Sequence, residues 1–187
     1  MLTRKACPEC AVKIAACSPP YCNDALVALS YEGLARDVML GFKYRNQRAV
    51  AALFAELLLA RLRTVQEIDH LDVVTWVPTT RERRVARGHD QAETLARSMG
   101  RSLGVPVRKL LERETAGHQT GHSRAQRLVG VALRARSMST PSTVLVVDDV
   151  VTTGATMRMA QQALSTAGAM RVVCIAVAAT PAPARRR

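Results

Sequence analysis

Two adjacent carboxylates, Asp148 and Asp149, follow four apolar residues (144–147) and precede a short hydroxyl-rich segment. The apolar run predicts a buried strand that ends at the acids. The segment Thr152-Thr153-Gly154-Ala155-Thr156 predicts a turn that opens a helix, where free backbone N–H groups suit a phosphate. Two acids beside a phosphate would be repulsive unless they faced vicinal ribose hydroxyls or a magnesium ion. The run therefore predicts a site for a ribose that carries a phosphate.

A second candidate anion site follows another predicted strand, 71–77, which Pro78 stops. Thr79, Thr80 and Arg81 come next, and hydroxyls with an arginine at a strand end are suited to an anion. A solvated basic loop is the alternative interpretation.

Two other classes of protein carry an acid pair after a strand. The nucleotide-binding P-loop class requires a Gly-Lys pair in its phosphate loop, and this chain has none. The receiver domains of response regulators need far more chain after the pair than follows Asp149 here. Both classes are therefore excluded.

Size and composition indicate one globular domain with a small appendage. The chain has 187 residues, 48% of them apolar, and a formal net charge of +12. The charge favours either nucleic-acid binding or a site for a highly anionic small molecule. Aromatic residues are 3%, a poor supply for base stacking. The sequence contains neither a membrane span nor a secretory signal, so we expect a cytoplasmic protein.

The cysteines divide into one core residue and an N-terminal group. Cys174 lies in an apolar run and is expected to be buried. The other four could bind zinc through their thiolates, and a decayed site without an ion is equally open. This candidate zinc-ribbon-like set is Cys7, Cys10, Cys17 and Cys22.

Alternating strands and helices predict an α/β fold, a mostly parallel sheet with helices on both faces. The expected domains are a Cys-rich segment 1–23, a main domain 24–180 and a disordered basic tail 181–187. The predicted strands are 25–31, 71–77, 107–111, 143–147 and 171–179, and the predicted helices are 33–42, 48–65, 91–103 (capped by Asp90), 124–136 and 154–167, with polar turns or loops at 43–46, 79–88 and 113–123.

Residues 144–156 resemble the 13-residue phosphoribosyl pyrophosphate (PRPP) motif of type I phosphoribosyltransferases. The resemblance implies the type I phosphoribosyltransferase fold. It also implies that Asp148 and Asp149 hold the ribose hydroxyls, and that Thr79 to Arg81 hold the pyrophosphate. The implied PRPP contacts on the first loop are Val150, Thr152, Thr153, Gly154, Ala155 and Thr156.

Three further segments resemble the competence protein F (ComF) family. They are Leu40-Gly41-Phe42-Lys43-Tyr44-Arg45, Arg87-Gly88-His89-Asp90-Gln91-Ala92-Glu93 and Gln119-Thr120-Gly121-His122-Ser123-Arg124-Ala125-Gln126-Arg127. The resemblance implies a phosphoribosyltransferase of nucleotide metabolism with a link to DNA uptake. His89, Asp90 and His122 depart from the family's usual residues, and the Cys-rich start is shorter than usual.

The resulting hypothesis is transfer of phosphoribosyl from magnesium-bound PRPP to an unidentified acceptor. Asp148, Asp149 and Arg124 are its candidate catalytic residues, with 113–124 as a lid. Histidines 89, 118 and 122 are either acid/base groups or surface residues. Two alternatives stay open: a non-catalytic PRPP sensor or DNA-uptake partner, and a basic nucleic-acid-binding protein. Whether the chain forms a homodimer is also open.

Overall fold

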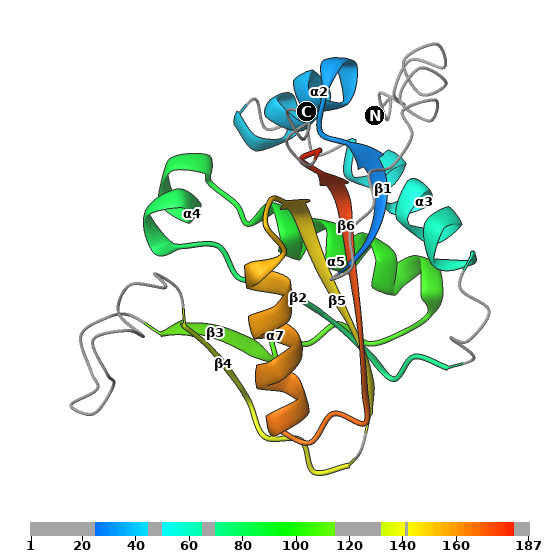
Figure 1. The fold of residues 1–187 in the computed structure, drawn as a ribbon, viewed down its shortest axis with the longest axis vertical. Helices are drawn as coiled ribbons and strands as arrows, with labels where there is room; N and C mark the ends of the chain where they lie inside the picture. Colours follow the sequence, from blue (N-terminus) through cyan, green and yellow to red (C-terminus); the bar gives the residue numbers. More distant parts are fainter. Residues whose placement is uncertain (1–24, 45–49, 65–69, 115–131, 141, 182–187) are drawn as a thin grey trace, which may run out of the picture.

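Four parallel strands form the central sheet, in the order β1-β6-β5-β2. The computed structural model describes residues 25–44, 50–64, 70–114, 132–140 and 142–181 (Figure 1). The strands are β1 (Leu26–Ser30), β2 (Val73–Trp76), β5 (Thr143–Val151) and β6 (Arg171–Ala179). Beyond β2, a bridge between Val74 and Val107 adds a short parallel segment to that edge.

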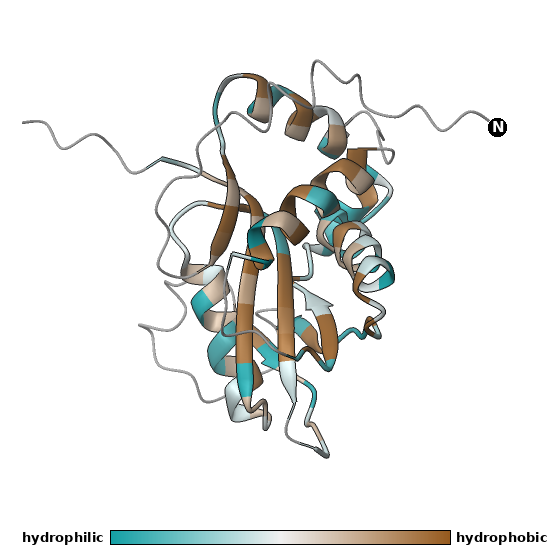
Figure 2. Ribbon diagram, turned by 90° about the vertical axis from the view of Figure 1, so that its right-hand side faces the viewer, coloured by the Kyte–Doolittle hydropathy of each residue, from teal (hydrophilic) through white to brown (hydrophobic). Residues whose placement is uncertain are grey.

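Helices cover both faces of this sheet, as the sequence predicts. One face packs against α2 (Gly33–Tyr44), α3 (Val50–Leu62) and α5 (Gln91–Leu103), and the other packs against α7 (Ala155–Thr166). Alternate residues of β5 serve the two cores: Val144 and Val146 face α7, whereas Leu145 and Val147 face the other layer. This is the period-two pattern of a strand buried on both faces. Figure 2 shows the apolar strands between the helices.

One short helix was not predicted. The basic segment 79–88, expected to be a loop, contains the short helix α4 (Arg81–Arg87). The Thr80 hydroxyl accepts from the N–H of Arg83 at its start, and Gly88 ends it with φ 72°. None of its residues is buried, so it lacks the apolar periodicity that reveals most helices.

The helix predicted over 124–136 is wrong for its described part, because Ala132–Ala135 form strand β4. Their side chains alternate between exposed and half-buried, and Leu133 and Ala135 pack against the α7 core. The partner is β3 (Leu111–Glu114), and the two make a separate antiparallel pair beside α7 (Figure 1). The strand predicted over 107–111 is likewise misplaced, since only Val107 bridges β2 before β3 begins.

Two boundaries move toward the candidate site. Strand β5 continues through the acids to Val151, so Asp148 pairs with Ala176 inside the sheet rather than following it. Helix α2 continues to Tyr44, which makes Lys43 a residue of its last turn rather than of a polar turn. Cys174 is 7% exposed, as expected for a core residue. Within the described chain, no helix has the length and apolarity required to cross a membrane.

Candidate functional site

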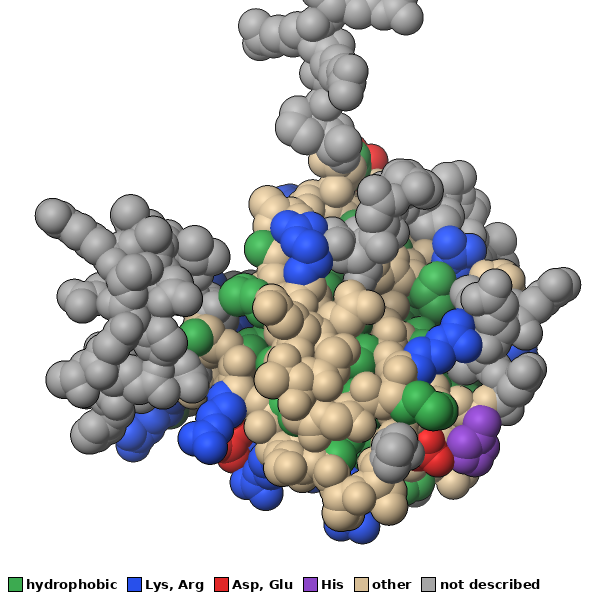
Figure 3. All heavy atoms as spheres, turned by 60° about the horizontal axis from the view of Figure 1, so that its bottom comes forward, with side chains coloured by type: hydrophobic (Ala, Val, Ile, Leu, Met, Phe, Trp, Pro, Cys, Tyr) green, Lys and Arg blue, Asp and Glu red, His purple; other side chains and the backbone are tan. Residues whose placement is uncertain are grey.

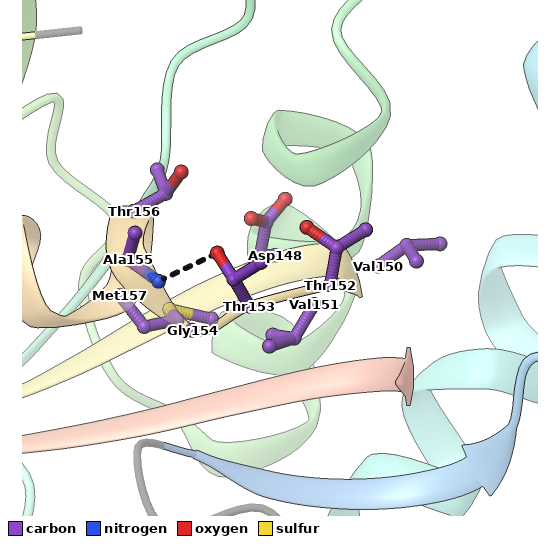
Figure 4. Close-up of a pocket in the computed structure, with 9 residues that line it drawn as sticks. All are labelled: Asp148, Val150, Val151, Thr152, Thr153, Gly154, Ala155, Thr156 and Met157. Carbon is purple, nitrogen blue, oxygen red and sulfur yellow. Dashed lines mark hydrogen bonds between the residues drawn. The ribbon is translucent and has the colours of Figure 1, made fainter. Parts of the chain in front are cut away.

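A hollow open to solvent lies where β5 leads into α7. The space in and above it, open solvent included, is about 230 Å³, and it is lined by Asp148, Val150, Val151, Thr152, Thr153, Gly154, Ala155, Thr156 and Met157. Figure 4 shows the Asp148 carboxylate and the threonine hydroxyls on one side, with Val151 and Met157 on the other. The structure thus brings together the first acid and the whole hydroxyl-rich loop predicted from the sequence.

The turn at the start of α7 is shaped for an anion. Gly154 caps the helix with φ 75°, a conformation that favours glycine, and it supplies no side chain to the first-turn N–H groups. The Thr153 hydroxyl accepts from the N–H of Ala155 at 3.4 Å (Figure 4). The next two N–H groups lie in the first turn, where an α-helix provides no internal acceptor. A phosphate would satisfy them and would meet the positive end of the helix dipole.

The two acids do not face the same surroundings. Asp148 lines the hollow before α7, whereas the Oδ2 atom of Asp149 lies 3.0 Å from the Nζ atom of Lys43 on α2. Each acid also accepts the N–H of the residue that follows it, at 2.7 Å in both cases. The carboxylates are therefore fixed in place by the backbone, and only one of them carries a direct lysine partner.

Burial raises the pKa of Asp148 well above its ordinary range, and the neighbouring charge of Asp149 raises it further. The N–H of Asp149 and the ammonium of Lys43 oppose this shift without cancelling it. Asp148 therefore holds a proton more readily than a free aspartate does. A ligand that donates hydrogen bonds or brings positive charge would favour its ionised form.

The turn at Thr79 to Arg81, the candidate pyrophosphate turn, is fixed in place by Asp90. The Oδ2 atom of Asp90 accepts the N–H of Thr79 at 3.0 Å, while its Oδ1 atom accepts the N–H groups of Ala92 and Glu93 as the α5 cap. Asp90 was predicted to be a cap, and this is confirmed. Because the Thr79 N–H and the Thr80 hydroxyl are engaged within the protein, the Thr79 hydroxyl and the exposed Arg81 side chain are the better placed groups for an anion.

Arg113 links this turn to the first acid. It lies on β3, and its Nε atom donates to the carbonyl oxygen of Pro78. Partial burial lowers the pKa of its guanidinium, and the nearby charge of Asp148 acts in the opposite direction. Arg113 thus contacts the residue before the turn at Thr79 and is affected by the charge of Asp148.

The segment 87–91 fastens α2 to α5. Gln91, which is 2% exposed, donates from its Nε2 atom to the carbonyl oxygen of Lys43 at 3.4 Å and accepts from Arg87 at 3.1 Å. His89 is 9% exposed and lies edge-on to Phe42, with ring centroids 6.0 Å apart. The interpretation of His89 as a surface residue is therefore wrong; it packs in the interior beside the site.

Several predicted residues lie outside the described part of the chain. They are Cys7, Cys10, Cys17, Cys22, His118, His122 and Arg124, together with most of the proposed lid and the segments 1–23 and 182–187. Among the residues that are described, no group of three or more His, Cys, Asp or Glu could hold a metal ion.

Sequence reasoning missed two residues of this site, Lys43 and Arg113. Lys43 stands in a ComF-like segment that was assigned no role, and its partner Asp149 is distant in sequence. Arg113 was placed at the start of the candidate lid 113–124, and the residue itself was assigned no role in binding. The signal that was available is that each is a basic residue near the C-terminal end of an element, Lys43 in the last turn of α2 and Arg113 in β3.

One family model matches the chain: the model described as phosphoribosyl transferase domain covers residues 86–187. The match includes the acid pair, the loop after it, and the segment around Asp90. No curated protein matches the sequence.

Solved structures similar to this chain carry related descriptions. Glutamine PRPP amidotransferase from B. subtilis, complexed with ADP and GMP, is 25% identical over 68% of this chain, with a TM-score of 0.46. This chain spans about a quarter of that protein, since 25% of its length is covered. Adenine phosphoribosyltransferase from Thermoanaerobacter pseudethanolicus is 13% identical, with 73% of this chain and 83% of that one covered and a TM-score of 0.46. The Trypanosoma brucei adenine enzyme, in complex with AMP, pyrophosphate and ribose-5-phosphate, is 13% identical, with 79% and 75% covered and a TM-score of 0.43.

Proposed function

The chain belongs to the phosphoribosyl transferase domain family, and from this premise we propose that it binds PRPP and transfers its phosphoribosyl group to an acceptor, releasing pyrophosphate. The observation that carries the proposal is the hollow between β5 and α7, where one acid and a glycine-capped helix start share a single cavity. An acid suits ribose hydroxyls, and the helix start suits the 5′-phosphate.

In the proposed reaction, the bond between ribose C1 and a pyrophosphate oxygen breaks, and its electron pair leaves with the pyrophosphate. A lone pair of the acceptor then forms the new bond to C1, and the proton carried by the attacking atom is lost to water. Positive charge develops on the ribose ring as in glycoside chemistry, so carboxylates beside the ring would stabilise it. We assign this role to Asp148 and Asp149. Magnesium, entering bound to PRPP, would neutralise the charge of the pyrophosphate leaving group.

The remaining contacts follow from placement. Thr152, Thr153 and the first turn of α7 would hold the 5′-phosphate. Arg113 and the turn at Thr79 would face the pyrophosphate, because Arg113 donates to the carbonyl oxygen of Pro78 next to that turn and is close enough to Asp148 to be affected by its charge. Most of the work proposed for the protein is positioning, which is the main contribution in group transfer from a good leaving group.

The test is calorimetric titration of PRPP into the purified full chain, with and without magnesium. We expect magnesium-dependent binding, weakened at least about a hundredfold in the double variant Asp148→Asn with Asp149→Asn. Asp37→Asn, which changes an exposed aspartate of α2, is the matched control and should bind like the wild type. Unchanged PRPP binding by the double variant would refute the site assignment. An acceptor screen that monitors pyrophosphate release would then test transfer.

A finer proposal is membership of the ComF type, with a role in DNA uptake. It is supported by the resemblance of segment 87–93, whose residues join α2 to the candidate pyrophosphate turn. The test is the transformation frequency of a competent strain that carries the double acid variant. A frequency equal to the wild type would count against any role of the PRPP site in uptake.

Nucleic-acid binding is the alternative function that one observation favours: Arg81, Arg83 and Arg84 of α4 are exposed. On the face shown in Figure 3, however, Lys and Arg side chains are scattered rather than gathered into one patch. Fluorescence anisotropy with a single-stranded oligonucleotide at several salt concentrations separates the two functions. Tight, strongly salt-dependent binding that survives the double acid substitution would favour the nucleic-acid alternative.

A further inference from the structure

Lys43 approaches the candidate site from the opposite side to α7. Its ammonium lies 3.0 Å from the Oδ2 atom of Asp149, and the two side chains are only 13% and 15% exposed. The ammonium also lies over the ring of Tyr31, 5.8 Å from its centroid. An ion pair on the surface would contribute little to stability and would be mobile. A pair that is largely buried, as this one is, holds its two side chains in a defined geometry.

Three separate elements hold Lys43 in this position. Phe42, which is fully buried, packs edge-on against Phe54 at 5.7 Å and against His89 at 6.0 Å. Gln91 of α5 donates to the carbonyl oxygen of Lys43, as described above. The end of α2 is therefore anchored on both sides of the lysine, and the ion pair is a built feature of the fold.

The pair can still bind a ligand. The Oδ1 atom of Asp149 accepts the N–H of Val150 and the Oδ2 atom meets Lys43, which leaves further lone pairs on both oxygens. An ammonium has three donors, so Lys43 also has hydrogen-bonding capacity beyond this contact. A sugar hydroxyl both donates and accepts, so it can donate to Asp149 and accept from Lys43 at once.

We propose that Lys43 and Asp149 act together as a recognition pair for one of the two vicinal ribose hydroxyls, with Lys43 as a specificity-determining residue. This inference rests on the proposed function and deepens it. Asp148, on the α7 side, would bind the other hydroxyl. The two acids, which lie in different surroundings, would then each bind one hydroxyl of the ribose. The ligand class is therefore a ribose phosphate rather than a deoxyribose phosphate.

The experiment titrates ribose 5-phosphate and its 2-deoxy and 3-deoxy analogues into the full chain. The variants are Lys43→Met, which removes the ammonium, Lys43→Gln, a second neutral variant, and Lys43→Arg, which keeps a cation. Lys109→Met is the matched control, because Lys109 forms an exposed ion pair with Glu112 at 3.6 Å, outside the site. Thermal midpoints establish that each variant is folded.

We expect the wild type to bind ribose 5-phosphate about tenfold more tightly than one of the deoxy analogues. Lys43→Met and Lys43→Gln should erase that preference by weakening the two ligands that keep the recognised hydroxyl, while binding of the deoxy analogue that lacks it stays unchanged, since the hydroxyl and the lysine are partners. Lys43→Arg should keep part of the preference, and Lys109→Met should keep all of it. A structural role alone would weaken all three ligands equally.

Two results overturn the inference and are distinct from each other. If the wild type binds ribose 5-phosphate but a folded neutral variant keeps the wild-type preference, or binds more tightly, Lys43 does not recognise the hydroxyl. If the wild type binds neither PRPP nor ribose 5-phosphate, the proposed function itself fails, and this inference fails with it.

Discussion

Replacing Asp90 by alanine should destabilise the fold and release the candidate pyrophosphate turn together. Asp90 is 5% exposed, and its two oxygens accept three backbone N–H groups, from Thr79, Ala92 and Glu93. Removing a helix N-cap costs about 1 kcal/mol, and leaving a half-buried N–H such as that of Thr79 without its acceptor costs about 1–3 kcal/mol. The expected total loss of unfolding free energy is about 2–4 kcal/mol.

Urea denaturation measures this loss, and amide hydrogen exchange locates it. For a chain of this size, about 3 kcal/mol corresponds to a fall in the melting midpoint of about 6–12 °C. In Asp90→Ala, the Thr79 amide should exchange faster than in the wild type. It should also lose its protection from exchange at a lower urea concentration than the amides of the central strands do. Asp90→Asn keeps one carbonyl oxygen, so it should lose about half as much.

The control is Asp37→Ala, which removes an exposed aspartate from the middle of α2 and should change stability by less than about 0.5 kcal/mol. The reasoning is refuted if Asp90→Ala unfolds within that same small margin of the wild type. It is also refuted if Thr79 keeps its protection, because the turn would then be held by something other than Asp90.

Three further predictions concern stability. Asp148→Asn should stabilise the ligand-free protein at neutral pH, because the pKa of the buried Asp148 is raised and its ionised form is costly. The unfolding free energy measured in urea should rise by about 1.4 kcal/mol for each unit by which the pKa of Asp148 is raised, and this difference from wild type should vanish below about pH 4. The N–H of Thr143 lowers the pKa of Asp72 and the carboxylate also meets His70, so wild-type stability should fall as pH drops below 3.8 through that lowered pKa, and Asp72→Asn should blunt the fall. Gly100→Ala should cost about 1–3 kcal/mol despite the better helix propensity of alanine, because its Cβ would lie 2.2 Å from the Cγ2 atom of Val107 and 2.9 Å from the carbonyl oxygen of Val105; adding Val107→Ala relieves only the first contact and should recover part of the loss in the same denaturation assay.

The parts of the fold predicted correctly are those fixed by local pattern. Helix α5 shows a cap at Asp90, an apolar stripe and a glycine after its end, and its observed bounds are the predicted ones. The sheet strands 73–76 and 171–179 are almost entirely apolar, with Thr75 and Arg171 as the exceptions, as expected for strands covered on both faces. Such signals lie within about a dozen residues of one another, so they can be recognised in the sequence without knowledge of the tertiary structure.

The errors arise where tertiary contacts override weak local signals. Strand β4 has a two-residue alternation, but its alanines, leucine and arginine also suit a helix, and only packing against α7 decides between them. The acids were predicted to follow the strand, whereas pairing with β6 extends β5 through them to Val151. A strand's end depends on the length of its neighbour, which no local pattern encodes.

The candidate site shows the same division. The loop 152–156 is contiguous and was assigned from sequence, and the structure places its residues around one hollow with Asp148. The partner of Asp149 was not foreseen, because Lys43 lies on a different element and reaches the acid only through the packing of α2. Whether these residues bind PRPP is a prediction that the titrations above address.

Adjacent residues at the start of α5 connect these two outcomes. Asp90 holds the turn at Thr79, and Gln91 holds the backbone of Lys43, so one step of the chain fixes both sides of the candidate site. Neither side chain needs to touch a ligand to influence binding, because each sets the position of a group that does. A segment of this kind is constrained by geometry rather than by chemistry, which explains how its residues can resemble a family motif while carrying no reactive group of their own at the proposed ribose site.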